Sequence, residues 1–125
     1  MTLLVFNNLL IQEQKKLGTI TEEGKLIKLL SSTLPYLDRC YVVRQEAIHR
    51  VGTPDYIICF EGIFVGIELK DDQGVQSKLQ IEKQQKINAA GGEYILADSV
   101  TPILSALNLI HKRNEDIARA LRVVQ

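Results

Sequence analysis

Two apolar runs separated by only two residues constrain the fold of this chain more than any other feature of its sequence. The runs are Tyr56–Phe60 and Ile63–Leu69, and Glu61 and Gly62 lie between them. Apolar runs of this length around a two-residue turn predict a β-hairpin. A tight turn brings together residues that are roughly equidistant from it. The head of the first strand is therefore expected beside the far end of the second.

The remaining sequence alternates between helical and extended patterns. Three helices are predicted, from a leucine stripe at 19–34 that ends at Pro35, from the segment 77–90 after the N-cap Ser77, and from 101–125, with a break near Asn114. β-branched and aromatic residues predict two more strands, at 40–45 and 93–97. We therefore expect an α/β fold of order α-β-β-β-α-β-α, with a central mixed sheet of about four strands flanked by helices.

Length and composition are typical of one globular domain. The chain has 125 residues, 46% of them apolar and 24% charged, which is enough for one hydrophobic core. Within a single domain, 1–125, we expect an N-terminal extension at 1–18, a core at 19–99 and a C-terminal helix at 101–125. The apolar start lacks the basic residues and cleavage site of a targeting segment, and no run approaches the ~20 apolar residues of a membrane span. A soluble intracellular protein is expected, with no membrane partner.

The cysteines and the charge balance narrow the classes of function. Cys40 and Cys59 lie in apolar, strand-like surroundings without a Cys/His cluster, so buried free thiols are expected rather than zinc ligands. Fifteen basic and 15 acidic residues give a net charge of +0, which counts against a sequence-independent nucleic-acid coat. A metal-dependent nuclease remains compatible, because it keeps carboxylates at its centre and concentrates basic residues locally.

Three charged residues gather at one end of the predicted hairpin. Asp55 heads the first strand, and Glu68 and Lys70 share one face at the end of the second, because side chains of a strand alternate. Charged groups on such an apolar strand are costly unless something uses them. Two carboxylates with a backbone carbonyl, that of Leu69, suit Mg²⁺ or Mn²⁺. Lys70 suits the orientation of a water molecule or the stabilisation of developing negative charge.

A longer pattern around these residues resembles a known nuclease family. The pattern is G-x-P-D at 52–55, E-x-K at 68–70, a glycine at 74 and S-x-x-Q at 77–80. Together these motifs look like the VRR-NUC branch of the PD-(D/E)xK nuclease superfamily, which occurs as small stand-alone phage-type nucleases and as the nuclease domain of larger DNA-repair proteins. The resemblance covers roughly residues 22–99.

This resemblance implies a restriction-endonuclease-like core and a divalent-metal-dependent DNA endonuclease. Its implied substrate is branched or structured DNA, such as four-way junctions or flaps. It makes Asp55 and Glu68 metal ligands, Lys70 the catalytic lysine and Gln80 an active-site residue that supports the metal or the scissile phosphate.

The family usually completes its acidic set with a glutamate on the first helix. Glu23 fits this role best, because Leu26 and Leu30 follow it on the core-facing stripe of that helix. Glu22 is the alternative, and both glutamates are also explained by the preference of a helix N-terminus for acids.

Four further residues are candidate DNA contacts. His49 and Arg50 precede the G-x-P-D motif, and Ser77 and Lys78 begin the helix that carries Gln80. Ordinary solvated surface is the alternative for each of them, and His111 is expected as a surface residue of the last helix.

One small domain carries one site, so symmetric cleavage of a junction needs a homodimer. The apolar residues 3–11 are a candidate interface, and core packing is their alternative.

Two other functions stay open. The first is a catalytically inactive nuclease-like subunit for DNA binding or assembly, against which the intact acid–acid–lysine set argues. The second is a hydrolase of RNA or nucleotides.

Overall fold

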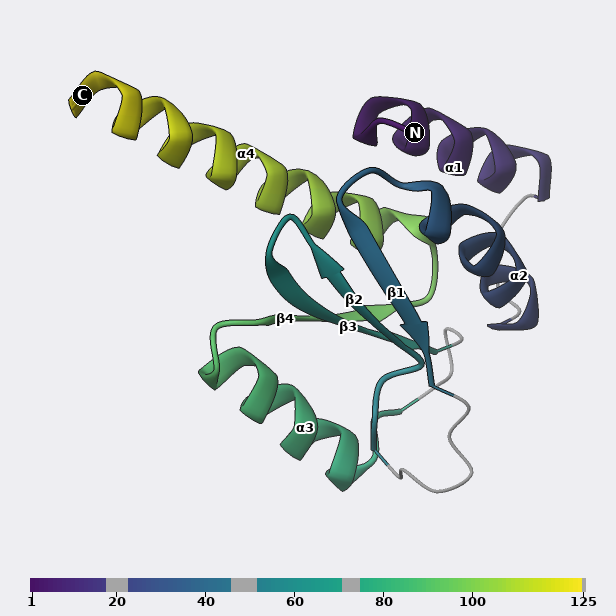
Figure 1. Ribbon diagram of the computed structural model, residues 1–125. Coiled ribbons are helices and arrows are strands. Elements are labelled where there is room, and N and C mark those ends of the chain that lie inside the picture. The colour runs from purple at the N-terminus through teal and green to yellow at the C-terminus, as the bar shows by residue number, and fades with distance from the viewer. Residues whose placement is uncertain (18–22, 46–51, 71–74, 125) are drawn as a thin grey trace.

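The computed structural model of the protein describes residues 1–17, 23–45, 52–70 and 75–124. It has a four-stranded mixed sheet with helices on both faces (Figure 1). In chain order the elements are α1 (Leu3–Leu17), α2 (Glu23–Thr33), the 3₁₀ turn η1 (Leu34–Tyr36), β1 (Cys40–Arg44), β2 (Tyr56–Phe60), β3 (Ile63–Leu69), α3 (Lys78–Ala89), β4 (Glu93–Ala97) and α4 (Val100–Val124).

The strands lie in the order β1-β2-β3-β4. β1 and β2 are antiparallel to their neighbours, and β4 is parallel to β3 because α3 carries the chain back across the sheet. The predicted hairpin is confirmed, with Tyr56 opposite Ile67 and Phe60 opposite Ile63. The expected α/β class and the four-stranded mixed sheet are confirmed as well.

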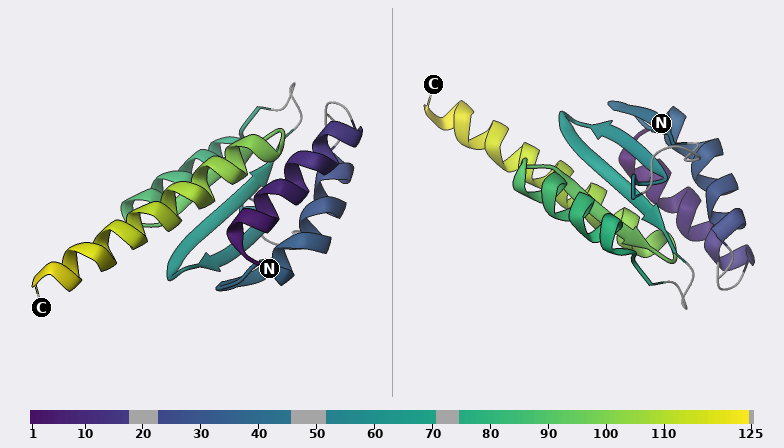
Figure 2. Two further views of the ribbon diagram at one scale, coloured as in Figure 1. Left: turned by 90° about the horizontal axis from the view of Figure 1, so that it is seen from above. Right: turned by 90° about the horizontal axis from the view of Figure 1, so that it is seen from below.

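The two faces of the sheet are covered very differently. One face supplies the core and lies under α1, α2 and α4 (Figure 2); its buried side chains are Tyr56, Ile58, Phe60, Val65, Ile67, Leu69, Ile95 and Ala97. Of the described helices, only α3 lies on the other face, and none of its residues is buried. The hydrophobic core therefore sits on one side of the sheet, and charged side chains have room on the other.

The N-terminal segment is part of the core rather than an extension. It forms α1, one helix more than expected, and Phe6 and Leu10 have no exposed surface. Asn7 interrupts the apolar run of the sequence, but its side chain exchanges two hydrogen bonds of 2.9 Å with Asn108 of α4. Asn7 therefore does not interrupt the helix, because its amide group is paired with Asn108 near the other end of the chain.

The last helix runs without a break. It begins at Val100, one residue before the predicted start, and its backbone N–H there donates to Gln14 Oε1 at 3.1 Å. Asn114, where a break was expected, donates instead to the carbonyl of Glu61 at 3.1 Å. The first half of α4 packs on the core, whereas every residue from Glu115 to Val124 is exposed.

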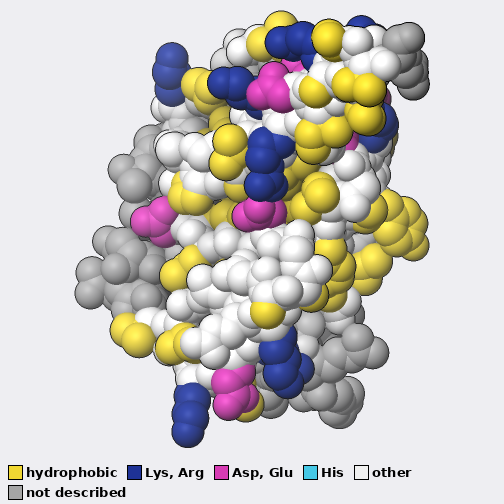
Figure 3. All heavy atoms as spheres, turned by 90° about the vertical axis from the view of Figure 1, so that its left-hand side faces the viewer, with side chains coloured by type: hydrophobic (Ala, Val, Ile, Leu, Met, Phe, Trp, Pro, Cys, Tyr) yellow, Lys and Arg dark blue, Asp and Glu magenta, His cyan; other side chains and the backbone are white. Residues whose placement is uncertain are grey.

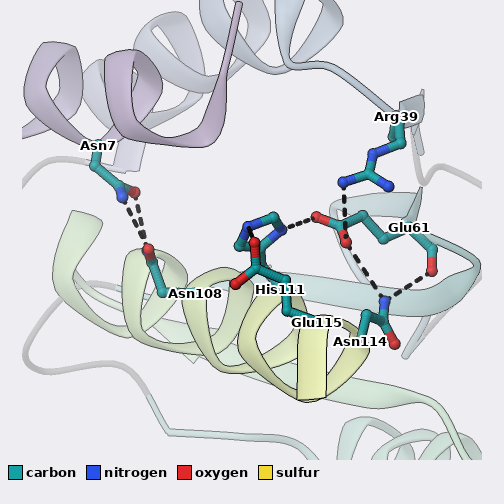
Figure 4. A network of polar contacts seen from close by, with 7 residues as sticks. All are labelled: Asn7, Arg39, Glu61, Asn108, His111, Asn114 and Glu115. Atoms are coloured by element: carbon teal, nitrogen blue, oxygen red, sulfur yellow. Dashed lines mark hydrogen bonds and ion pairs between the residues drawn. The ribbon is translucent and has the colours of Figure 1, made fainter. Parts of the chain in front are cut away.

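The hairpin turn is tied to α4 through one buried carboxylate (Figure 4). The side chain of Glu61 is 5% exposed, and its Oε2 lies 2.6 Å from Nδ1 of His111. Arg39 approaches the other oxygen at 3.5 Å. His111 is thus half-buried rather than a simple surface residue, and its second nitrogen lies 3.1 Å from Glu115. These contacts fix the end of the hairpin against the helix.

Replacing Glu61 tests how much this connection stabilises the fold. Glu61 and Gly62 both have positive φ, +49° and +84°, a turn geometry for which Asn-Gly is the preferred pair. Glu61→Asn should therefore improve the turn but lose the reach to His111. We expect a net loss of about 1–3 kcal/mol, the cost of leaving buried polar partners unsatisfied, measured by urea unfolding. Glu115→Ala removes the exposed contact of the same histidine and should change little; equal effects of the two variants would contradict the role of Glu61.

The two cysteines are free but are not both buried. Cys40 is half-buried, and burial together with the nearby Cys59 raises the pKa of its thiol to about 11. Cys59 is exposed, because its side chain points to the face of the sheet that α3 covers only in part.

Among the described residues, no helix is long and apolar enough to cross a membrane.

Candidate active site

The hairpin places Asp55 beside the end of β3. Tyr56 pairs with Ile67, so the residue before it reaches the level of Glu68. The carboxylate of Asp55 accepts a hydrogen bond from the backbone N–H of Leu69 at 2.8 Å. This bond uses one oxygen, Oδ2, and holds the side chain at the strand end where the sequence predicted a metal site.

Glu68 is a buried acid on the face that α3 covers. Its side chain is only about 5% exposed, whereas its neighbours Ile67 and Leu69 point into the core. Gln80 of α3 donates from Nε2 to Glu68 Oε1 at 2.6 Å, and Nζ of Lys70 lies 3.9 Å from the same oxygen. Glu68, Lys70 and Gln80, all predicted site residues, therefore form one connected group.

The start of α3 fixes Gln80 in this position. Ser77 is the N-cap, as predicted: its hydroxyl accepts from the backbone N–H of Gln80 at 3.2 Å. In return, Oε1 of Gln80 accepts from the backbone N–H of Ser77 at 2.8 Å. This capping box satisfies two N–H groups that a helix terminus leaves without partners. The S-x-x-Q motif thus has a structural role as well as its contact with Glu68.

Two glycines let the motif segments approach one another. A Cβ atom on Gly66 would lie 2.9 Å from Pro54 and 3.3 Å from Ile87 of α3, too close for a rigid proline ring. Gly52 has φ of +84°, and a Cβ there would meet Leu79 at 2.9 Å. The loop before Asp55 therefore packs against both β3 and the first turn of α3, which holds the carboxylate in place.

Sequence reasoning missed Tyr94, which lies near the acidic pair of Asp55 and Glu68. It lies opposite Gly66 in the sheet, and its hydroxyl is 3.3 Å from Nε2 of Gln76, which also donates to Gln84 at 3.1 Å. Burial raises the pKa of Tyr94, and negative charge on Glu68 and Asp55 raises it further, so the phenol keeps its proton. Only the parallel pairing of β4 with β3 reveals this neighbour.

The structure describes only some of the other predicted site residues. Lys78 is exposed at the start of α3, and Ser77 is exposed as its N-cap. Glu23 is the first residue of α2, but its side chain is not among those described. The alternative Glu22 and the candidate DNA contacts His49 and Arg50 lie outside the described residues, as does the motif glycine at 74.

The carboxylates of Asp55 and Glu68 suit a hard divalent cation that is bound by few protein ligands. Within the described part of the chain, no group of three or more His, Cys, Asp and Glu side chains could hold a metal ion. Asp55 and Glu68 are a pair of carboxylates at the same end of β3, and each is oriented by a hydrogen bond, from Leu69 and from Gln80 respectively. Mg²⁺ commonly binds through one or two carboxylates and keeps several waters, so this pair fits it.

Comparison of the chain with protein-family models, with curated proteins and with solved structures returned no match.

Proposed function

We propose that this protein is a divalent-metal-dependent DNA endonuclease of the VRR-NUC type, with a restriction-endonuclease-like core. The observation that carries the proposal is the group at the hairpin end, in which Asp55, Glu68, Lys70 and Gln80 lie together although they come from β3, α3 and the residues that flank β2 and β3. The sheet order and the crossover through α3 are compatible with that core. An intracellular location follows from a DNA substrate.

Each residue of the group has a distinct part in the proposed reaction. Asp55, Glu68 and the carbonyl of Leu69 would hold Mg²⁺ or Mn²⁺, with Glu23 or Glu22 as a further acid. The bound ion supplies an activated water and neutralises charge on the phosphate. Gln80 holds one oxygen of Glu68 and so fixes the orientation of the carboxylate. Lys70 is 26% exposed and can present its charge to the scissile phosphate.

A cleavage assay with Mg²⁺ or Mn²⁺ tests the proposal directly. The substrates are linear duplex, single-stranded, flap and four-way-junction DNA of related sequence, and structured RNA provides the comparison for an RNA hydrolase. We expect metal-dependent cleavage, strongest on the branched DNA. Binding of DNA without cleavage would identify an inactive DNA-binding or assembly subunit instead.

We propose a homodimer as the assembly that cuts both strands of a junction. The candidate interface at residues 3–11 narrows to the outer face of α1, because Phe6 and Leu10 belong to the core. Leu4, Val5 and Ile11 are 69%, 53% and 43% exposed, and a cluster of exposed apolar side chains is typical of an interaction surface.

Leu4→Glu should convert a dimer to a monomer in sedimentation velocity, because it places a charge in the apolar interface. Ile117→Glu is the matched control, since Ile117 is 58% exposed on the free half of α4. A dimer that survives Leu4→Glu, or one lost only with Ile117→Glu, would place the interface elsewhere.

A further inference from the structure

On the face of the sheet that carries the acidic pair, no described helix covers β1 and β2, and we call this part the open face (Figure 2). Seen from below, α3 lies to one side of these strands (Figure 2). Tyr41, Phe64 and Val43 point to this face and are 72%, 45% and 38% exposed. Figure 3, which shows the molecule from the left-hand side of Figure 1, has hydrophobic side chains at the surface with Lys and Arg side chains among them. An open apolar surface of this kind is typical of a binding site.

Two of these aromatic residues lie in one row across three strands. Tyr41 of β1 pairs with Cys59 of β2, and Cys59 pairs with Phe64 of β3, so all three side chains point to the same face. Glu68 follows Phe64 by four residues on the same strand and faces the same way. At ~3.3 Å per residue, the ring lies about 13 Å along the strand from the acidic pair.

Three of the seven aromatic residues of the chain point to this side of the sheet. The sequence has four tyrosines and three phenylalanines. Phe6, Tyr56 and Phe60 are core residues with at most 1% exposure. Tyr41 and Phe64 point to the open face, and Tyr94 of β4 points to the same side of the sheet beside Gly66. Tyr41 and Phe64 are the exposed rings, whereas the sheet beyond Phe64 is covered at Gly66 by Pro54 and Ile87 of α3.

Lysines border the row of aromatic residues. Lys86 of α3 lines a hollow of about 270 Å³ together with Phe64, Ile87 and Gly92. Lys83 is half-exposed on the same helix, and Lys70 lies next to Glu68, six residues beyond Phe64 in the chain. Rings that stack on bases and flanking cations that bind phosphates are the combination found in single-strand-binding surfaces. A purely apolar protein interface does not need the flanking cations.

We propose that Tyr41 and Phe64 bind unpaired bases of the DNA, so that a single-stranded segment lies on the open part of the sheet face that also carries the acidic site. This inference rests on the proposed nuclease function and specifies its substrate: branched DNA with an unpaired arm, such as a flap, rather than a fully paired duplex. Stacking on a ring face accepts any base, so the surface selects strandedness and not sequence.

Binding is measured by fluorescence anisotropy with the full chain, a labelled short thymidine oligonucleotide and EDTA to prevent hydrolysis. Tyr41→Ala and Phe64→Ala should each weaken single-strand binding by roughly 5- to 100-fold, because alanine removes the stacking surface. Tyr41→Phe should retain binding. Tyr36→Ala is the control, because Tyr36 is 69% exposed but lies in η1, outside the strands.

A native thiol reports on the same surface without any substitution. Cys59 lies between the two rings and is exposed, whereas Cys40 is half-buried with its pKa raised to about 11 and should react slowly. The oligonucleotide should therefore protect Cys59 from alkylation, and a paired duplex of the same length should protect it less.

Unchanged binding in Tyr41→Ala and Phe64→Ala, or equal protection of Cys59 by single strand and duplex, would overturn the proposal. A change in sedimentation without a change in oligonucleotide binding would show that the face is a protein interface, and would also overturn it. The EDTA assay needs no hydrolysis, so a failure of the nuclease function appears separately, as an absence of cleavage with normal single-strand binding.

Discussion

Asp55→Asn is expected to abolish metal-dependent cleavage while the protein stays folded. The asparagine can still accept the hydrogen bond from the N–H of Leu69, so the loop and the strand end remain in place. What is lost is the negative charge that binds the cation. Loss of one preorganised charge in a catalytic site lowers the rate roughly 100- to 1,000-fold. Initial cleavage rates on a flap or junction, with melting temperature as a check on folding, measure this effect.

Lys70→Ala separates metal binding from chemistry. Because Lys70 is a cation, its removal should leave metal affinity intact while cleavage falls, whereas Asp55→Asn should lower both. Isothermal titration with Mn²⁺ measures the affinity of each variant. Asp116→Asn is the matched control, because this exposed aspartate lies on the free half of α4. Activity that survives both site substitutions would remove the proposed mechanism, and a large fall in melting temperature would show that these residues are structural.

Phe6→Ala is expected to destabilise the fold by about 3–5 kcal/mol, the usual cost of truncating a buried phenylalanine. Its side chain has no exposed surface and belongs to the core formed by α1, α2, α4 and the sheet. Native domains have a total stability of about 5–15 kcal/mol, so this one substitution removes a large share of it. Urea unfolding followed by circular dichroism measures the loss.

Gln12→Ala provides the comparison on the same helix. Gln12 is exposed and lies outside the proposed dimer interface, and surface substitutions usually change stability by no more than about 0.5 kcal/mol. Equal unfolding midpoints for Phe6→Ala and Gln12→Ala would mean that α1 does not pack as described.

The hairpin and the spacing within the candidate site could be predicted because their signals are local. A two-residue turn fixes the pairing of β2 with β3, and this pairing brings Asp55 next to Leu69. Ser77 as a candidate N-cap likewise predicted the start of α3, and the structure adds a capping box with Gln80, three residues later. Neither inference requires knowledge of a distant part of the chain.

The features that sequence reasoning missed depend on distant partners. Asn7 looks like an interruption of an apolar run until Asn108 is placed beside it, 101 residues later. Glu61 looks like an exposed turn residue until α4 covers it. Tyr94 becomes part of the site only when β4 pairs with β3. For Glu61 and Tyr94 the sequence pattern predicted the turn or strand but not the residue that lies against it, and for Asn7 it did not predict the helix either.

The double bonding of Gln80 has a consequence for how the site is assembled. With Oε1 held by the N–H of Ser77, the amide nitrogen has to face Glu68, because the flipped orientation would oppose two donors at one end and two acceptors at the other. A glutamate has no donor to offer, and an asparagine is one methylene shorter. The first turn of α3 and the orientation of Glu68 therefore form together. An unfolded helix start would leave the acid misplaced, and a folded one delivers it already oriented, before any ligand arrives.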